Sequence, residues 1–504
     1  MIYMRKIIKN KWLLLPVLLA MVVLNIIACK KDFLDRQPLG RFTEDDLSSG
    51  SFDSKVFGAY AVLRKGGFNN HEYLGVQSYR ADESEKGSST SDGASTGLMY
   101  DDFEYNKSGG GLQTYWTDHY QAINAANDII HTVDSIGATD PATLINKAEA
   151  KFIRAFCYFD LVRAFGSVPK IDFVGTPAQL NIAKSTPAQI FTLIDADLAE
   201  AAAVLPLQWE AKYIGRLTKG AALALQAKAY LWRSNWTAAL NSAKAVIALG
   251  VYSLVPKYGD QFRVTGENGP ESIFEIQAFY QPTNDQGIIY SNVQGVRGAG
   301  AWDLGWGWNV PTQILVDEFE TGDPRKVETI LFSGQVDPLY SENVPPVPTV
   351  PRPYWNKKIH TNPADRTTLN NRFGPWMNHR ILRYADVLLM AAEAANEVGG
   401  TQNTTDALAW LEQVRKRARG TNNAILPAIT TTDQAQLRTA IRHERFVEMG
   451  MEEQRFWDIV RWGIDVTVLH AAGKANYAIK HRLLPIPQGE IDKSGGVLIQ
   501  NPDY

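Results

Sequence analysis

Aromatic side chains are the residues of this 504-residue sequence that point most clearly to chemistry, with 13 Trp and 20 Tyr. Trp302, Trp306 and Trp308 lie close together and alternate with glycines. Indole rings can stack on the C–H faces of sugar rings. We predict that these tryptophans form a stacking platform for carbohydrate, turned toward solvent by the bare backbone of Gly305 and Gly307. The alternative for Trp306 and Trp308 is packing beneath their own loop.

The familiar catalytic motifs are missing from the sequence. His443 and Glu444 begin like a zinc-protease helix, but Val447 stands where the second His would be. The loop at Gly305 lacks the third glycine of a dinucleotide fingerprint, and no P-loop lysine pattern occurs. We therefore predict that the protein is not an enzyme and that it holds no metal and no cofactor.

A glycosidase is the enzymatic alternative, because two carboxyl groups could flank a glycosidic bond. Adjacent acids occur at Asp82 and Glu83 and again at Asp101 and Asp102. The sequence does not give the separation of such groups across a cleft, so this alternative stays open.

Composition and charge narrow the class of protein. Hydrophobic residues make up 45% of the chain and charged residues 21%, which is ordinary for a folded globular protein. The formal net charge is -3, so the chain lacks the basic field that nucleic-acid binding requires. We expect a packed core and no nucleic-acid partner.

The first 28 residues have the pattern of a targeting segment. Basic residues precede an apolar run over residues 12–24, and Ala28 stands directly before Cys29. This ending resembles a bacterial lipobox, in which the cysteine thiol accepts a diacylglyceryl group, the chain is cleaved before the cysteine, and the new amino terminus is acylated too. We predict a signal peptide over 1–28, lipidation at Cys29 and a polar tether over 29–50. The alternative is a plain secretory signal with an incidental cysteine.

Helical periodicity dominates the body, which we predict to be a single mainly α domain over residues 51–504. Apolar residues recur at three- and four-residue spacings, and small residues at the contacts resemble tetratricopeptide helix pairs. The expected helices cover residues 52–65, 112–136, 142–165, 187–205, 218–234, 236–248, 382–398, 406–419, 434–450 and 452–462. The helical scaffold thus spans about 112–249 and 379–463, and loop-rich insertions at about 66–111 and 250–378 form an irregular ligand-binding half. The second cysteine, Cys157, is expected to be a small buried hydrophobe.

Recognisable motifs lie in the C-terminal third. They are RYADVLLMAAEAAN at 383–396, HERFVEMGMEEQRFWDIVRW at 443–462, and LPIPQGEI at 484–491 with QNPDY at 500–504. The segment CKKDFLD at 29–35, followed by Pro38, adds a fourth match near the start. In order and spacing these stretches resemble the SusD/RagB family over essentially the whole mature chain.

The resemblance implies a SusD-like fold and a lipid-anchored outer-membrane protein that faces the cell exterior. Such a protein captures oligosaccharide or polysaccharide and passes it to a SusC-like TonB-dependent transporter; a peptide or another nutrient is the alternative cargo. Relatives use the early loop beside the aromatic platform, so the resemblance adds Asn69, Tyr73, Arg80 and Asp82 to the predicted glycan contacts. Arg380 is a further candidate donor, with a simple surface charge as its alternative.

The charged residues of these motifs have a structural explanation. Five of them fall at three- and four-residue spacings along two successive helices: Arg445, Glu448, Arg455, Asp458 and Arg461. Such spacings allow ion pairs that lock helices together. We predict that these residues carry the fold, together with Arg383 and Glu393, and that they do not bind the ligand.

Overall fold

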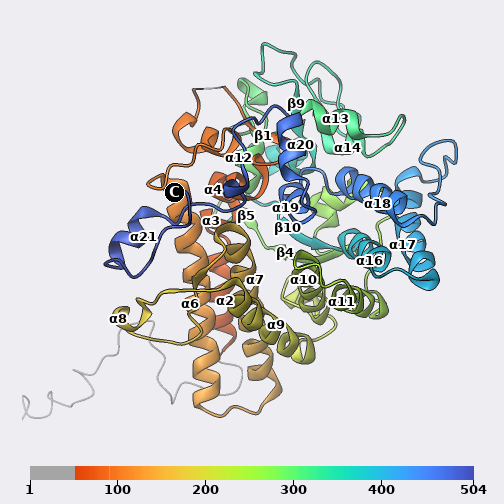
Figure 1. Ribbon diagram of the computed structural model, residues 1–504. Coiled ribbons are helices and arrows are strands. Elements are labelled where there is room, and N and C mark those ends of the chain that lie inside the picture. The colour runs from red at the N-terminus through yellow and green to blue at the C-terminus, as the bar shows by residue number, and fades with distance from the viewer. Residues whose placement is uncertain (1–51, 90) are drawn as a thin grey trace, which may run out of the picture. The chain divides into compact units, whose positions relative to one another are not determined.

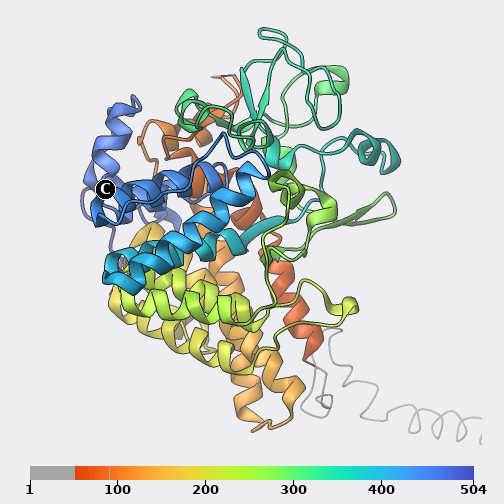
Figure 2. The ribbon, with the colours of Figure 1, turned by 90° about the vertical axis from the view of Figure 1, so that its right-hand side faces the viewer.

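The computed structural model describes residues 52–89 and 91–504, and in it long helices lie side by side (Figure 1). Their number and length confirm the mainly α fold. Figure 2 shows the long helices gathered on one side of the unit Phe52–Tyr504 and the loop-rich segments on the other. The predicted signal peptide, the lipidation site Cys29 and the tether lie outside the described residues. Within the described residues, no helix is both long and apolar enough to cross a membrane.

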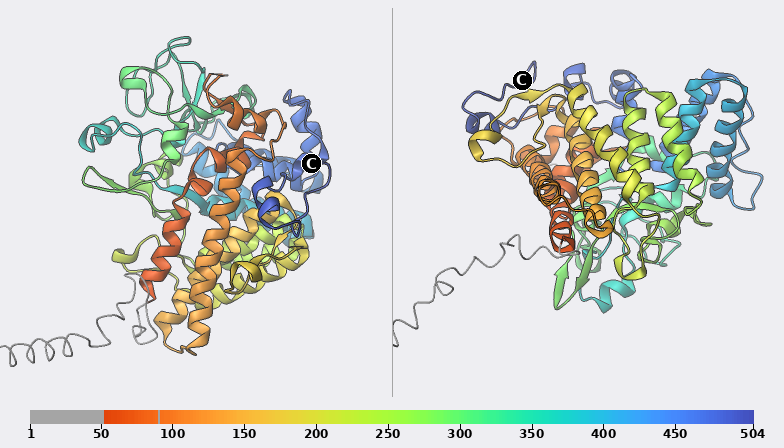
Figure 3. Two further views of the ribbon diagram at one scale, coloured as in Figure 1. Left: turned by 90° about the vertical axis from the view of Figure 1, so that its left-hand side faces the viewer. Right: turned by 90° about the horizontal axis from the view of Figure 1, so that it is seen from below.

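Helices that follow one another in the sequence form the scaffold. They are α2 (Asp53–Leu63), α6 (Gly110–Ser135), α7 (Pro141–Phe165), α9 (Pro187–Val204), α10 (Lys219–Trp232), α11 (Trp236–Ala248), α16 (Tyr384–Val398), α17 (Thr401–Arg419), α18 (Gln434–Met449) and α19 (Arg455–Arg461). α7 contacts α6 and α9, α10 contacts α9 and α11, and α16 contacts α11, α17 and α18. The right-hand view of Figure 3 shows this array from below. The pairs α6–α7, α10–α11 and α16–α17 match helix pairs expected from the sequence. The sequence also favours a pair of 434–450 with 452–462, but α18 packs mainly on α16 and α17.

Local sequence explains where the helices begin and how closely they approach. Thr186 and Gln189 form a capping box at the start of α9, and Pro187 occupies its first turn, where no backbone N–H is needed. Ala221 and Ala224 are fully buried in α10, so its backbone can lie close to neighbouring helices. Cys157 is buried and unpaired within α7, as predicted.

Buried ion pairs fasten the C-terminal helices to one another, as the motif spacings predict. Arg445 donates to Asp458 and to Asp386 at 2.6 Å each. Arg461 pairs with Glu393 through both oxygens of that carboxylate, at 2.5 and 2.6 Å. These pairs tie α16, α18 and α19 together.

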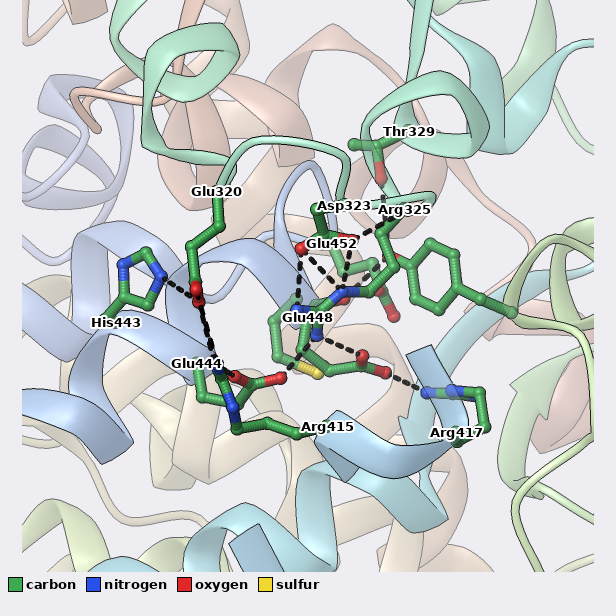
Figure 4. A network of polar contacts seen from close by, with 12 residues as sticks. Glu320, Asp323, Arg325, Thr329, Arg415, Arg417, His443, Glu444, Glu448 and Glu452 are labelled. Atoms are coloured by element: carbon green, nitrogen blue, oxygen red, sulfur yellow. Dashed lines mark hydrogen bonds and ion pairs between the residues drawn. The ribbon is translucent and has the colours of Figure 1, made fainter. Parts of the chain in front are cut away.

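Glu448 on α18 is the centre of a second network, shown in Figure 4. Its carboxylate accepts hydrogen bonds from Arg383 at 2.6 Å, from Arg325 at 3.1 Å and from Arg417. Burial by itself would raise the pKa of Glu448, but the three guanidinium groups hold it well below its usual range. The network therefore keeps a fully buried charge inside the helical scaffold.

Short elements connect and follow the long helices, and most of them lie in the loop-rich half. The helices are α3 (Gly66–Asn69), α4 (His71–Leu74), α5 (Met99–Asp101), α8 (Pro177–Leu180), α12 (Tyr290–Gln294), α13 (Gln313–Glu318), α14 (Lys326–Thr329), α15 (Pro363–Thr368), α20 (Asp465–Ala471) and α21 (Gln488–Lys493). The antiparallel ribbons are β1 (Ser84–Gly87) with β7 (Trp308–Pro311), β2 (Val168–Pro169) with β3 (Lys184–Ser185), β4 (Ser272–Ile276) with β10 (His379–Arg383), β5 (Phe279–Gln281) with β6 (Asn284–Gln286), and β8 (Ile330–Phe332) with β9 (Tyr354–Asn356). The β1–β7 ribbon places Gly87 opposite Trp308 and so joins the early loop to the tryptophan segment.

Candidate functional site

Three aromatic rings from two distant segments form what we call the ring cluster: His71, Trp306 and Trp308. His71 stacks on Trp308, with ring centroids 5.2 Å apart and planes inclined by 16°. The Trp306 ring lies beside both, and its centroid is 6.3 Å from that of His71 and 5.9 Å from that of Trp308. His71 and Trp306 are half-buried, whereas Trp308 is only 4% exposed. The cluster therefore leaves parts of an indole and an imidazole open to solvent, supported by a buried indole.

Trp308 is covered by the loop that follows β1. Gly93 lies so close that an added Cβ would come within 2.1 Å of the indole. Asp92 accepts a hydrogen bond from the indole N–H at 3.2 Å, and the Lys86 ammonium lies 5.1 Å from the ring centre. The prediction that Trp308 offers a free face to ligand is therefore wrong, because this loop occupies that face.

Gly305 and Gly307 serve close packing and do not push the rings outward. A Cβ on Gly305 would lie 2.2 Å from the Asn292 carbonyl oxygen, and one on Gly307 would lie 2.6 Å from the Arg297 side chain. The backbone N–H of Trp306 donates to the same Asn292 carbonyl at 2.8 Å. The bare backbone thus allows the tryptophan segment to lie directly on its neighbour, which corrects the expectation from the sequence.

Charged side chains surround the ring cluster, and their charges have partners. Arg297 lies 3.3 Å from Asp92, which also accepts a hydrogen bond from the Ser88 hydroxyl at 2.8 Å. Lys86 donates to backbone carbonyl oxygens of the loop that covers Trp308. Burial lowers the pKa of His71 to about 4, so its imidazole is neutral at pH 7. The surface combines exposed ring edges with hydrogen-bonding groups, which suits a polar ligand with apolar faces.

Trp302 lies apart from the ring cluster. Its indole is half-buried and stacks on His360, with centroids 6.0 Å apart and planes inclined by 6°. It also packs against a core cluster that includes Val296, Leu304 and Trp355. One face of the ring is thus taken by His360, and the part that remains exposed is open to a ligand.

Asn69 and Tyr73 point into the interior of the protein. Asn69 is fully buried, donates to the Leu63 carbonyl at 2.7 Å, and places its side-chain oxygen 3.2 Å from Nδ1 of His379. Tyr73 is 5% exposed and meets the His379 ring edge-on at 5.3 Å, and burial raises the pKa of its phenol well above the usual value. Both residues belong to a buried cluster around His379, which corrects their predicted role as glycan contacts.

Arg80 and Asp82 also hold the fold together. Arg80 is fully buried, donates to the Val76 carbonyl at 3.0 Å, and lies 3.8 Å above the ring of Phe456. Asp82 accepts two hydrogen bonds from Arg455, at 2.8 Å each, and so fastens the early loop to α19. Their selection as glycan contacts is corrected for the same reason as that of Asn69: both side chains are buried and contact partners inside the protein.

Arg380 is buried on β10 and is not a surface charge. Its side chain is 8% exposed, donates to the Arg263 carbonyl at 2.9 Å, and faces Glu267 at 3.8 Å and Glu275 at 4.0 Å. Burial raises the pKa of Glu267 to about 7, against the opposing influence of Arg380. Its predicted contact with ligand is therefore corrected, because Arg380 is engaged by Arg263, Glu267 and the β4 residue Glu275.

Three of the four acids considered for glycoside hydrolysis, Asp82, Asp101 and Asp102, line a polar cleft of about 620 Å³ beside β1, whereas Glu83 is buried outside its lining. Asp82 pairs with Arg455, and Asp101 lies 3.1 Å from Lys474. Burial raises the pKa of Asp101, although Lys474 opposes that shift. Asp102 is exposed and has no ion-pair partner within the described residues. Glu85 also lines the cleft and pairs with Arg352, so the cleft holds three carboxylates paired with cations and one, Asp102, that faces solvent.

Two family models divide most of the chain between them. The model of the SusD family matches residues 270–504, and the model described as "Starch-binding associating with outer membrane" matches residues 32–231. The chain belongs to the SusD/RagB family. The resemblance read from the C-terminal motifs is thereby confirmed.

Individual members of the SusD/RagB family match over most of their length. SusD-like protein P2 of Formosa agariphila is 26% identical over 512 residues, which cover 96% of this chain and 98% of the relative. Starch-binding protein SusD of Bacteroides thetaiotaomicron is 24% identical over 443 residues, 73% of this chain and 74% of the relative. The solved structure of a laminarin-binding SusD-like protein matches with a TM-score of 0.76 and 27% identity, covering 90% of this chain and 99% of that chain.

Sequence reasoning within this SusD/RagB chain missed the residues that complete the ring cluster. His71 stands two positions before Tyr73, which was selected instead, and no local pattern distinguishes the two. Lys86, Asp92 and Arg297 are ordinary loop charges in the sequence. The sequence does contain a signal for the pairing of strands β1 and β7, because both segments border glycine-rich loops.

Proposed function

We propose that the protein is a glycan-binding protein of the cell surface and that it binds saccharide on the exposed part of the ring cluster. Trp306 carries this proposal: it is a half-buried indole fixed between His71 and the buried Trp308. A ring that is already held in place loses little conformational entropy when a sugar stacks on it. Trp302 is the second proposed stacking ring, and Arg297 and Asp92 are the proposed hydrogen-bonding groups.

We expect the glycan to be uncharged. Arg297 is paired with Asp92, and Arg372 is paired with Asp303 at 2.7 Å close to Trp302 in sequence. A uronate or a sulfate would have to displace one of these carboxylates, whereas sugar hydroxyls can add hydrogen bonds to the existing pairs. Laminarin, a neutral polysaccharide named for one similar solved structure, is the natural first probe.

We also propose that Cys29 is lipidated, that the protein faces the cell exterior, and that it delivers its glycan to a SusC-like TonB-dependent transporter. The family description "associating with outer membrane" supports the membrane part of this proposal. Relatives are named for binding starch or laminarin, which supports a role without catalysis. Capture of a peptide or another nutrient is the alternative, and glycoside hydrolysis at the polar cleft is the weaker one.

Calorimetric titration against a panel of laminarin, starch and a polyuronate tests this proposal. We expect at least one neutral polymer to bind, and we expect Trp306→Ala to weaken that binding at least tenfold, or about 1.4 kcal/mol. Trp236→Ala is the matched control, because Trp236 is a half-buried indole of α11 with no ring contact in the described part of the chain.

Three outcomes would contradict the proposal. Equal affinity of Trp306→Ala and wild-type protein would remove the ring cluster as the binding site. Binding of a peptide mixture without any saccharide would favour the alternative cargo. Release of reducing sugar ends by the purified protein would identify a glycosidase.

A further inference from the structure

A second groove, of about 560 Å³, lies along α6 on residues that the ring cluster does not use. One wall is the segment 169–182, which contains α8, and the other is the C-terminal segment 490–498. Figures 1 and 3 show α8 and α21 on the same side of α6. Asn181 joins the two walls by donating to the Ser494 carbonyl at 3.0 Å. The volume is within the range of small-molecule sites, roughly 300–1,000 Å³.

Aromatic and aliphatic side chains alternate with amides in the lining of this groove. Tyr120 is half-buried beside Trp116, with ring centroids 5.0 Å apart, and Leu180 adds an aliphatic wall. Asn124 and Asn181 bring side-chain amides to the rim. Rings and aliphatic groups suit the C–H faces of a sugar, and amides suit its hydroxyls, so both kinds of contact are present.

Two hydrogen-bond donors of the groove have no partner in the described part of the chain. Trp116 is only 3% exposed, lines the groove, and makes no hydrogen bond through its indole N–H. The amide of Asn124 is also unpartnered. The Trp116 nitrogen keeps contact with solvent at the groove wall, so it is free to donate to a ligand oxygen there.

The charges of the groove are balanced. Glu490 lies 2.8 Å from Lys493 and also accepts a hydrogen bond from Gln113. The Tyr120 hydroxyl donates to the Pro169 carbonyl at 2.8 Å, which fixes the ring in place. A fixed ring, free amide donors and no uncompensated charge favour an uncharged saccharide over an ionic ligand.

We propose that this groove is a second saccharide-binding site, which takes a short, uncharged stretch of glycan. The proposal rests on the proposed function for the identity of the ligand but on a separate set of residues for the site. A long polysaccharide can engage both sites of one chain, and its second contact then forms at a high effective concentration, which can strengthen binding by about 10²–10⁴-fold. A trisaccharide too short to reach both sites gains nothing from the pair.

The test blocks the groove with Leu180→Arg and compares it with Ala178→Arg, an exposed position of the same short helix outside the lining. Laminarin and its trisaccharide, or the best polymer of the panel and its trisaccharide, are titrated into each variant. We expect Leu180→Arg to weaken polymer binding at least tenfold and to reduce the trisaccharide stoichiometry from two to one. Ala178→Arg should change neither value.

Trp116→Phe supplies a second variant that keeps an aromatic ring and removes the N–H donor. We expect it to weaken trisaccharide binding at the groove severalfold while the unfolding temperature stays close to that of wild type. Unchanged polymer affinity and stoichiometry in Leu180→Arg, with binding weakened in Trp306→Ala, would overturn the groove and leave the ring cluster in place. The reverse pattern would retain the groove and reject the ring cluster. A wild-type protein that binds no saccharide would reject both.

Discussion

The helical scaffold and the ring cluster use charge in opposite ways. In the scaffold, Glu448 is fully buried and is surrounded by three arginines. Beside the ring cluster, the pair Arg297–Asp92 has an arginine side chain that is 46% exposed. Breaking a buried pair costs several kcal/mol, whereas an exposed pair contributes at most about 1 kcal/mol. The comparison teaches that the motifs behind the family resemblance hold the helices together, while the exposed charges beside the ring cluster can change at little cost to the fold.

The largest expected effect is that of Glu448→Ala. It leaves Arg383, Arg325 and Arg417 in the interior with fewer carboxylates, so we expect the free energy of unfolding to fall by about 3–5 kcal/mol. Denaturant unfolding measures the change. The control is Asp406→Ala, which removes the partly exposed partner of Lys244 and should cost less than about 1 kcal/mol. Equal losses in the two variants would abolish the contrast between buried and exposed charge.

The next effect separates the two tryptophans of the ring cluster. Trp308→Ala empties a buried volume beneath the loop of Gly93, so we expect it to lower the free energy of unfolding by about 3 kcal/mol. Trp306→Ala removes a half-buried ring and should cost about 1 kcal/mol or less, although it weakens glycan binding more directly. Thermal unfolding and calorimetry on the same preparations measure both quantities. A stable Trp308→Ala protein would show that this indole does not support the cluster.

The smallest effect is a pH dependence of the stability at Glu267, beside Asn378 and Arg380. Burial raises the pKa of Glu267 to about 7, so the folded protein holds a proton there that the unfolded chain has released above about pH 4.5. The contribution of Glu267 to stability therefore falls as the pH rises from about 4.5 to 7. Glu267→Gln stays neutral and can keep the hydrogen bond from the Asn378 N–H. Between pH 5 and pH 8, we expect the free energy of unfolding of the variant to rise by about 1–2 kcal/mol relative to that of wild type.

Unfolding curves of wild-type protein and Glu267→Gln at pH 5, 6, 7 and 8 measure this difference. A constant offset between the two proteins across that range would mean that the pKa of Glu267 is the same in the folded and the unfolded protein. Arg380→Met is a useful companion, because removing the neighbouring cation should raise the pKa of Glu267 further and move the transition to higher pH.

The helical scaffold could be predicted from the sequence because its signals are local. Periodic apolar residues, the proline and capping box at 186–189, and the charge spacings of 445–461 each lie within one or two turns of helix. Those spacings account for Asp458 as a partner of Arg445 and Arg461. They do not account for Asp386 and Glu393 on α16, or for Asp82 in the early loop, which pairs with Arg455.

The site could be predicted only in part, because burial in the loop-rich half depends on contacts between distant segments. No residue near Arg80 in the sequence predicts its contact with the ring of Phe456, which covers it. The exposed part of Trp306 followed from residue type alone, whereas the burial of Trp308 depends on Gly93, which lies on the other strand's loop. Residue chemistry therefore selected a segment with a half-buried indole at Trp306 but could not tell that Trp308 beside it is buried.

The bonds between Asp82 and Arg455 join residues that are 373 positions apart. The chain is synthesised from the amino terminus, so the early loop is complete long before α19. Asp82 therefore has no Arg455 to pair with until α19 has been made. Closing so long a stretch of chain is slow compared with forming a helix. A polypeptide that ends before Arg455 would therefore form most of its helices but could not fix the early loop through this ion pair. The early loop then reaches its final position only after the C-terminal helices have formed.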